Sequence, residues 1–325
     1  MRRLAALAAA LVIATIAGCG GAPITDPYQL VYAASKAGTP DVVQVKVGLA
    51  TTGAKPVTIS PDAFKLTVDS KTKKFRMQVE LPVASLGLPA AQLQAFGVTG
   101  DTISADLLWD GTGIYLNSPA AAKVLSLLMT QMGQTPPASL DGWLRLGTAA
   151  EFAELAGKLG GQLGAMPSIA PAASESAITD AASLKSKLEP NGVTLTYVET
   201  ASRNGVNANH VSMAFDWAKL ATNPALKSVT TAQLAQLTAL ADKSDVGVDL
   251  WLDASTSRLV EIDAQVAQKA GAASGTPEMV DLTILIGAPD VATTLDAPAT
   301  YTEVALTPLI QSLVEQFGKG LIPTP

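Results

Sequence analysis

The sequence predicts an α+β fold built around an antiparallel sheet. Apolar and polar residues alternate with a period of two in many short segments, a pattern typical of strands with one face on a core and one in water. Segments of this kind outnumber helical segments by about two to one. Strands and helices do not alternate regularly along the chain, so nothing indicates a parallel sheet.

The composition excludes several classes of function. The chain has 325 residues, of which only 15% are charged, and its 22 basic and 28 acidic side chains give a net charge of −6. This balance offers no basic surface to a phosphate backbone, so we expect no nucleic-acid partner. One cysteine and one histidine can form neither an intramolecular disulfide nor a tetrahedral Cys/His zinc site.

The N-terminus predicts export and a lipid anchor. Arg2 and Arg3 precede an apolar run, residues 4–17, which is too short for a membrane span and suits a signal peptide. The run ends in Ile16-Ala17-Gly18-Cys19, which resembles the lipobox of bacterial lipoproteins. The resemblance implies that residues 1–18 are cleaved off and that Cys19 carries a diacylglycerol, with palmitate as the expected type of acyl chain. The alternatives are a plain secreted protein and a buried cysteine.

The predicted anchor sets the expected location. Two acyl chains on one residue meet the condition for stable membrane attachment. Residues 19–25 then form a lipidated tether, which reaches only roughly 20 Å when extended. We therefore expect the protein at the extracytoplasmic face of the cell membrane, or of an outer membrane if the cell has one.

The first half of the body begins with a short helix and continues as strands. Asp26 is a good N-cap, Pro27 suits the first helical position, and apolar residues recur at helical spacing up to Ala37. The sequence Asp110-Gly111 predicts a hairpin turn. The expected strands are 43–49, 64–68, 75–81, 103–109 and, after the turn, 114–116.

The next segment is helical in character. Residues 120–132 have one apolar side, and Thr148 with Glu151 forms a capping box ahead of a second amphipathic run, residues 152–159. A short strand, residues 143–146, lies between the two. Residues 164–177 are rich in Ala, Ser and Pro and indicate a surface loop, either a lid or a linker.

The second half returns to strands. Two further helices are expected, one around Leu234 and Leu237 and one that begins at Thr307-Pro308, and residues 270–276 indicate a turn. The expected strands are 193–197, 211–217, 246–252, 260–266 and 280–286.

The order of these elements, together with the lipobox, resembles the LolA-like superfamily and in particular the mycobacterial LppX/LprG type of glycolipid-carrier lipoprotein. The stretches that carry the resemblance are residues 193–217 and 246–266, each a strand, a polar or Gly-containing turn and a returning strand. The resemblance implies a curved antiparallel β half-barrel with helices covering its concave face and a hydrophobic cavity between them. It also implies a single domain, residues 26–325, with an inserted or extended region near 118–190.

The cavity would be lined by apolar residues of the strands and of one helix. Core packing is the alternative role for each of them, because Met and Leu at helical spacing are ordinary core residues. The predicted lining consists of Val45, Val47, Leu66, Val68, Met77, Val79, Leu107, Trp109, Leu125, Leu128, Met129, Met213, Phe215, Leu250, Leu252, Leu282 and Ile284.

Catalytic chemistry is not expected. The only histidine, His210, lies on a predicted strand with Ser212 and Asp216, where a triad is conceivable, but such a strand offers no sharp turn or oxyanion hole. The carboxylates Asp249 and Asp253, like Asp106 and Asp110, suit a solvated sheet face at least as well as a cation site. We therefore expect no enzyme activity, no cofactor and no metal.

Two functions remain. The first is a membrane-tethered carrier that binds the acyl chains of a lipid or glycolipid, with an envelope transport protein as a further partner. The second is a LolA-like sensor or scaffold lipoprotein that binds envelope proteins without transporting lipid. Co-purification of lipid separates the two hypotheses.

Overall fold

The structure is a computed structural model, and it describes residues 24–53, 56–86, 94, 98, 100–131, 133, 135–137, 139–148, 150–151, 178–221, 243–269, 279–289 and 293–304. The signal peptide and Cys19 lie outside these residues. So do the helical run 152–159, the loop 164–177, the turn 270–276 and the two helices expected near Leu234 and after Thr307. None of the described helices is long and apolar enough to cross a bilayer.

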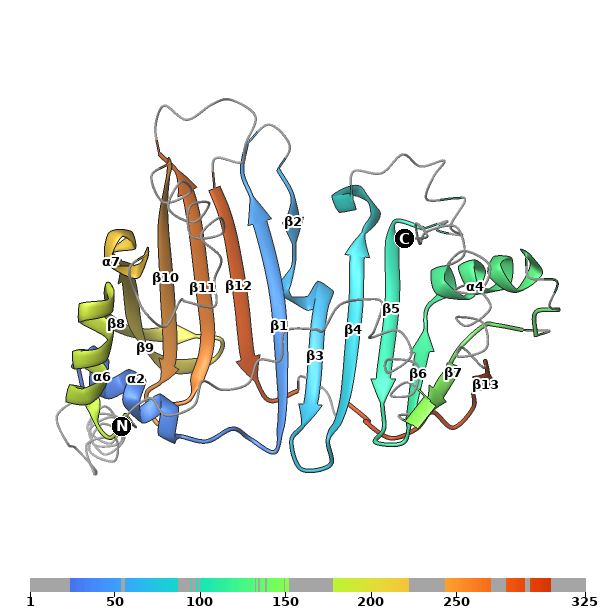
Figure 1. The fold of residues 1–325 in the computed structure, drawn as a ribbon, viewed down its shortest axis with the longest axis horizontal. Coiled ribbons are helices and arrows are strands. Elements are labelled where there is room, and N and C mark those ends of the chain that lie inside the picture. The colour runs from blue at the N-terminus through green and yellow to red at the C-terminus, as the bar shows by residue number, and fades with distance from the viewer. Residues whose placement is uncertain are drawn as a thin grey trace, which may run out of the picture.

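A single 13-stranded sheet dominates the molecule (Figure 1). Its strand order is β13-β7-β6-β5-β4-β3-β1-β12-β11-β10-β9-β8, with β2 paired to β1 beside this path. Every pairing is antiparallel except that of β13 with β7. Because β13 and β8 lie at opposite edges, the sheet is open, and the predicted α+β class with a curved antiparallel sheet is confirmed. The strands are β1 (Val42–Thr51), β2 (Thr58–Ile59), β3 (Phe64–Asp69), β4 (Lys74–Pro82), β5 (Thr102–Trp109), β6 (Gly113–Asn117), β7 (Leu144–Thr148), β8 (Val193–Arg203), β9 (Val206–Phe215), β10 (Ser244–Asp253), β11 (Leu259–Gln268), β12 (Met279–Gly287) and β13 (Thr302–Glu303).

Short helices accompany the sheet. The N-cap prediction is confirmed, since the Asp26 side chain accepts hydrogen bonds from the backbone N–H groups of Tyr28 and Gln29. The capping box of Thr148 and Glu151 is also present. The α-helices are α2 (Pro27–Lys36), α4 (Pro119–Gln131), α6 (Ala181–Leu188) and α7 (Trp217–Ala221), and the 3-10 helices are η1 (Pro61–Ala63), η2 (Val83–Leu86) and η3 (Glu189–Asn191).

One strand boundary in the prediction is wrong. The alternation of apolar residues continues from Phe215 to Trp217, but β9 ends at Phe215 and Trp217 is the first residue of α7. The reason is the residue between them, because the Asp216 side chain accepts a hydrogen bond from the backbone N–H of Lys219 and so caps the helix. A capping residue ends the strand although the period of two runs on.

The pairing register gives the sheet two chemically different faces. Val45 lies opposite Leu66 and Ile286, and Leu66 lies opposite Met77. Residues that lie directly opposite each other share a face. Followed from strand to strand, this rule gathers the predicted apolar strand positions on one side, which we call the apolar face, and the intervening polar positions on the other, the polar face.

Helices α2, α6 and α4 lie at the two ends of the apolar face. At the β8–β10 end, Tyr28 and Leu30 of α2 and Leu184 of α6 form a buried cluster with Val211 and Leu252. At the opposite end, helix α4 contributes Ala122 and Leu125 to a cluster with Leu144 and Val304.

The polar face is crossed by the chain that follows β12. Leu295 packs on Leu108 and Tyr115, and Lys74 forms an ion pair of 2.6 Å with Asp296. This segment then reaches β13 at the far edge, where the Thr302 N–H donates to the carbonyl of Trp143. The polar side of the sheet is therefore partly covered, where the alternation alone predicts a solvated face.

Candidate functional site

The apolar face contains every strand residue predicted to line a cavity. The predicted lining on β4 and β5 is joined by the pairs Met77 with Leu107 and Phe75 with Trp109. On the other side of β1, Val47 lies opposite Ile284, and Ile284 lies opposite Ile262. The strand residues that share this face are Val45, Val47, Leu66, Val68, Met77, Val79, Leu107, Trp109, Met213, Phe215, Leu250, Leu252, Leu282 and Ile284.

Packing divides this face into two ends and a middle. Leu252, which is 2% exposed, belongs to the cluster under α2, and Met213 and Leu250 pack against that cluster. At the other end Leu125 is buried and Met129 packs against it, while Leu128 is half-buried. At both ends, therefore, predicted lining residues also serve as core.

The middle of the apolar face is less closely packed. The predicted lining on β3, β4, β1 and β12 is half-buried throughout. Within the described part of the chain none of these side chains joins a buried cluster. A continuous surface of aliphatic side chains and Met77 thus lies between the two helix-covered ends.

On the polar face, Arg203 at the end of β8 links the β8–β9 hairpin to β11 through ion pairs. The guanidinium of Arg203 lies 2.6 Å from one Glu261 carboxylate oxygen and 2.9 Å from Asp263. Asn204, at the hairpin tip, also donates to Glu261, and the Arg203 guanidinium lies over the ring of Trp251 at 4.9 Å. Glu261 is only 2% exposed, and burial raises the pKa of its carboxyl, an effect that the bonds from Arg203 oppose.

The only histidine lies beside this network. The ring of His210 stacks on Trp251 with 4.2 Å between centroids, and its Nε2 lies 2.9 Å from an oxygen of Asp249. Asp216 caps α7 and lies six positions after His210 along an extended strand, which places it roughly 20 Å away. The structure therefore does not bring His210, Ser212 and Asp216 together as a triad.

The aspartates considered for a cation have partners of their own. The Asp106 carboxylate binds the Arg76 guanidinium through several hydrogen bonds, and Asp110 accepts from the backbone N–H groups of Thr112 and Gly113. Asp253 accepts from the N–H groups of the turn that follows β10. Among the described residues, no group of three or more potential ligands has the geometry of a metal site.

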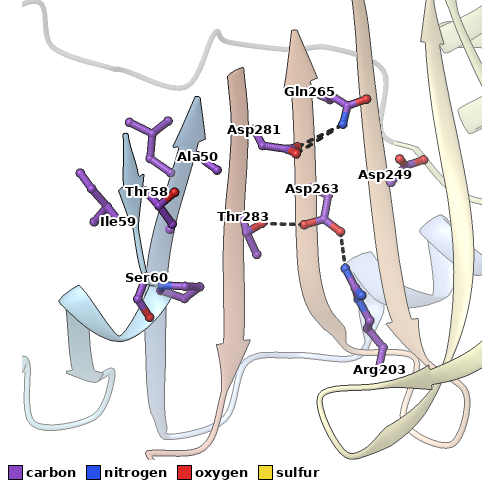
Figure 2. Close-up of a pocket in the computed structure, with 13 residues that line it drawn as sticks. Ala50, Thr58, Ile59, Ser60, Arg203, Asp249, Asp263, Gln265, Asp281 and Thr283 are labelled. Atoms are coloured by element: carbon purple, nitrogen blue, oxygen red, sulfur yellow. Dashed lines mark hydrogen bonds and ion pairs between the residues drawn. The ribbon is translucent and has the colours of Figure 1, made fainter. Parts of the chain in front are cut away.

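Two of the pockets that described residues line open on the polar face. One, of about 400 Å³, lies between β2 and η1 on one side and β10–β12 on the other, with Arg203 at its rim (Figure 2). The second, of about 380 Å³, lies on the other side of the hairpin tip, where Asn204 and Val206 face Gln44 and Leu285. The alternation in the sequence predicts a solvated face for the polar residues of both pockets, because no local pattern marks them as neighbours.

Comparison with known proteins adds a likeness of fold. No protein-family model and no curated protein matches the chain. Among solved structures, the lipoprotein LppX of Mycobacterium tuberculosis is 10% identical, with a TM-score of 0.34 over 83% of this chain and 97% of that one. LprF from Mycobacterium bovis is 12% identical, with a TM-score of 0.35 over 85% and 100%. MucB, solved in complex with MucA(peri), is 10% identical, with a TM-score of 0.26 over 84% and 60%.

The chain is similar in fold to LppX and LprF. Identities and TM-scores as low as these do not transfer a ligand or a partner to this chain.

Proposed function

We propose that this protein is an extracytoplasmic lipoprotein, anchored through Cys19, that binds the acyl chains of a lipid or glycolipid on the apolar face and carries or presents them. The observation that supports the proposal is the half-buried middle of that face. Helices pack at both of its ends, while the predicted lining between them joins no buried cluster of the described residues. A surface of this kind is suited to alkyl chains.

The physical benefit of such a surface is large. Each methylene removed from water contributes about 0.8 kcal/mol, so a chain of about 16 carbons costs on the order of 13 kcal/mol when it is exposed. Unaided transfer between membranes is therefore slow. A protein that covers the chain lowers this barrier, and a short tether keeps it close to the bilayer from which it loads.

The binding proposal is tested by lipid extraction. The full chain is produced with Cys19→Ser, purified without detergent and extracted with organic solvent, and the extract is analysed by mass spectrometry. Ile284→Gln and Leu285→Gln are compared in the same background, because these neighbours on β12 are both half-buried aliphatic residues and lie on opposite faces. We expect co-purified lipid, reduced severalfold by Ile284→Gln and unchanged by Leu285→Gln.

Two results would contradict the proposal. One is the absence of lipid from repeated preparations, and the other is an equal loss in both variants. If lipid is absent but the tethered protein captures an envelope protein, the sensor or scaffold hypothesis replaces the carrier.

The anchor is tested separately by fractionation. Cys19→Ser removes the sulfur that would accept the diacylglycerol, so we expect the protein to move from the membrane fraction to the soluble fraction. Immunoblotting of separated fractions measures the shift. A membrane fraction unchanged by the substitution would show that attachment does not depend on Cys19.

A further inference from the structure

The polar-face pocket that has Arg203 at its rim is separate from the apolar face. Its floor is formed by β10, β11 and β12, which are hydrogen-bonded to one another, so the sheet itself lies between the two sites. Its volume of about 400 Å³ falls within the range of small-molecule sites, about 300 to 1,000 Å³. A ligand in this pocket therefore does not contact the apolar face.

One wall of the pocket is held by close backbone packing. A Cβ atom at Gly48 would lie 2.7 Å from the Pro61 side chain, so the absence of a side chain allows η1 to pack directly on β1. Asp62 of η1 is then fixed by Lys46 at 3.0 Å and Lys65 at 3.3 Å. The hydrogen bond from Lys46, with its charge, lowers the pKa of Asp62.

The opposite wall is held by the ion pairs that the partly exposed Arg203 forms with the buried Glu261 and with Asp263. The side chain of Arg203 reaches the pocket from the β8–β9 hairpin and binds Asp263 (Figure 2). Together with its bonds to Glu261, this contact fixes the hairpin tip over β11. The two walls are thus anchored by unrelated interactions from distant parts of the sequence. A cleft between two fixed walls keeps its shape without a ligand.

The floor presents both acceptors and donors of hydrogen bonds. Asp263 is already occupied, since one oxygen accepts from the Thr283 hydroxyl and the other from Arg203 and Trp251. Asp281 is different, because among the described residues it accepts from the Gln265 amide, at a long 3.4 Å to each oxygen. The hydroxyls of Thr58 and Ser60 complete the polar lining from the side of β2.

This combination selects against several ligands. Asp249, Asp263 and Asp281 repel anions, and a polar floor does not suit an alkyl chain. A cation would compete with Arg203, which already neutralises part of this charge. A neutral molecule with many hydroxyl groups uses the polar part of the lining, because each hydroxyl donates to a carboxylate and accepts from an amide or a hydroxyl, while its C–H groups suit the apolar side chains of Leu49, Ile59 and Pro61.

We propose that the pocket binds a saccharide. Asp281 and Gln265 hold its hydroxyl groups on the floor, and Thr58 and Ser60 face it from the wall formed by β2 and η1. The proposal does not depend on lipid binding, because the two sites lie on opposite faces of the sheet.

Saturation-transfer NMR and calorimetry test the proposal. The detergent-solubilised full chain is titrated with glucose, mannose, arabinose and trehalose, and the same titrations are made with lysine and spermidine. We expect at least one of the sugars to bind. We expect Asp281→Asn to weaken that binding by about tenfold or more, since a hydrogen bond to a charged acceptor is worth about this factor.

A matched control and a second variant complete the experiment. Asp245→Asn makes the same change on β10, on the same face of the sheet but outside the pocket. The exposed Asp245 lies 3.7 Å from Lys269. This variant should leave sugar binding unchanged. Gln265→Ala should weaken binding as Asp281→Asn does. The proposal is overturned if no sugar binds, if lysine or spermidine binds in place of the sugars, or if sugar binding persists in both pocket variants.

Discussion

The two faces of the sheet are built from alternate residues of the same strands, yet different forces hold them. On the apolar face, side chains such as Val211 and Leu252 are buried by packing under the helices. On the polar face, burial is accompanied by hydrogen bonds and charge pairs, as for Glu261 with Arg203 and for Gln44 with Thr67. The apolar side chains of the middle strands can thus stay half-buried on one face while specific polar contacts hold the opposite face.

The largest expected effect tests packing on the apolar face. Leu252→Ala removes a side chain that is 2% exposed and belongs to the cluster under α2, so it should lower the free energy of unfolding by about 2 to 5 kcal/mol. Leu282→Ala, on the same face in the middle of the sheet, removes a half-buried side chain and should cost only about 1 kcal/mol. Urea denaturation of both variants measures the difference.

Equal losses in the two variants would contradict the division of the apolar face into packed ends and a looser middle. If co-purified lipid increases the loss of unfolding free energy caused by Leu282→Ala, the middle of the apolar face is also identified as the lipid-contacting part. Lipid that contacts Leu282 adds to the stability of the folded state by mass action.

The apolar face is predictable from the sequence because it depends on local periodicity. Each strand contributes residues such as Val45, Leu66 and Ile284 by simple alternation, and antiparallel pairing then places them together. The same reasoning fails for Trp217, where a capping aspartate ends the strand, and for α6, a short helix of eight residues in which Leu184 is the buried apolar position.

The polar face is not predictable in this way, because its contacts join distant segments. Arg203 and Glu261 are 58 residues apart, and no spacing between them signals an ion pair. Likewise Gly48 has a clear role only once Pro61 lies against it. The sequence indicates that these positions are polar or small, but the long-range geometry alone shows that they form the walls of a pocket.

The smallest expected effect is a pH dependence that belongs to the polar face. Burial raises the pKa of Glu261 above its ordinary value of 4.5, with the bonds from Arg203 opposing the shift and the neighbouring Asp263 adding to it. As the pH falls, the Glu261 carboxylate is therefore protonated at a higher pH in the folded chain than in the unfolded chain. By linkage, charged Glu261 costs stability at neutral pH, and this cost disappears as the pH falls through the raised pKa towards 4.5.

Glu261→Gln should remove this contribution and flatten the stability profile in that pH window. The effect should be smaller than the loss in Leu252→Ala, because the Arg203 ion pair offsets part of the cost of burying the charge. Urea denaturation at several pH values, with Glu80→Gln as a control at an exposed position of the same face, provides the measurement. A difference between Glu261→Gln and the unmodified protein that does not vary with pH would show that folding leaves the pKa of Glu261 unchanged, and the Arg203 ion pair would then fully offset the cost of burying the charge.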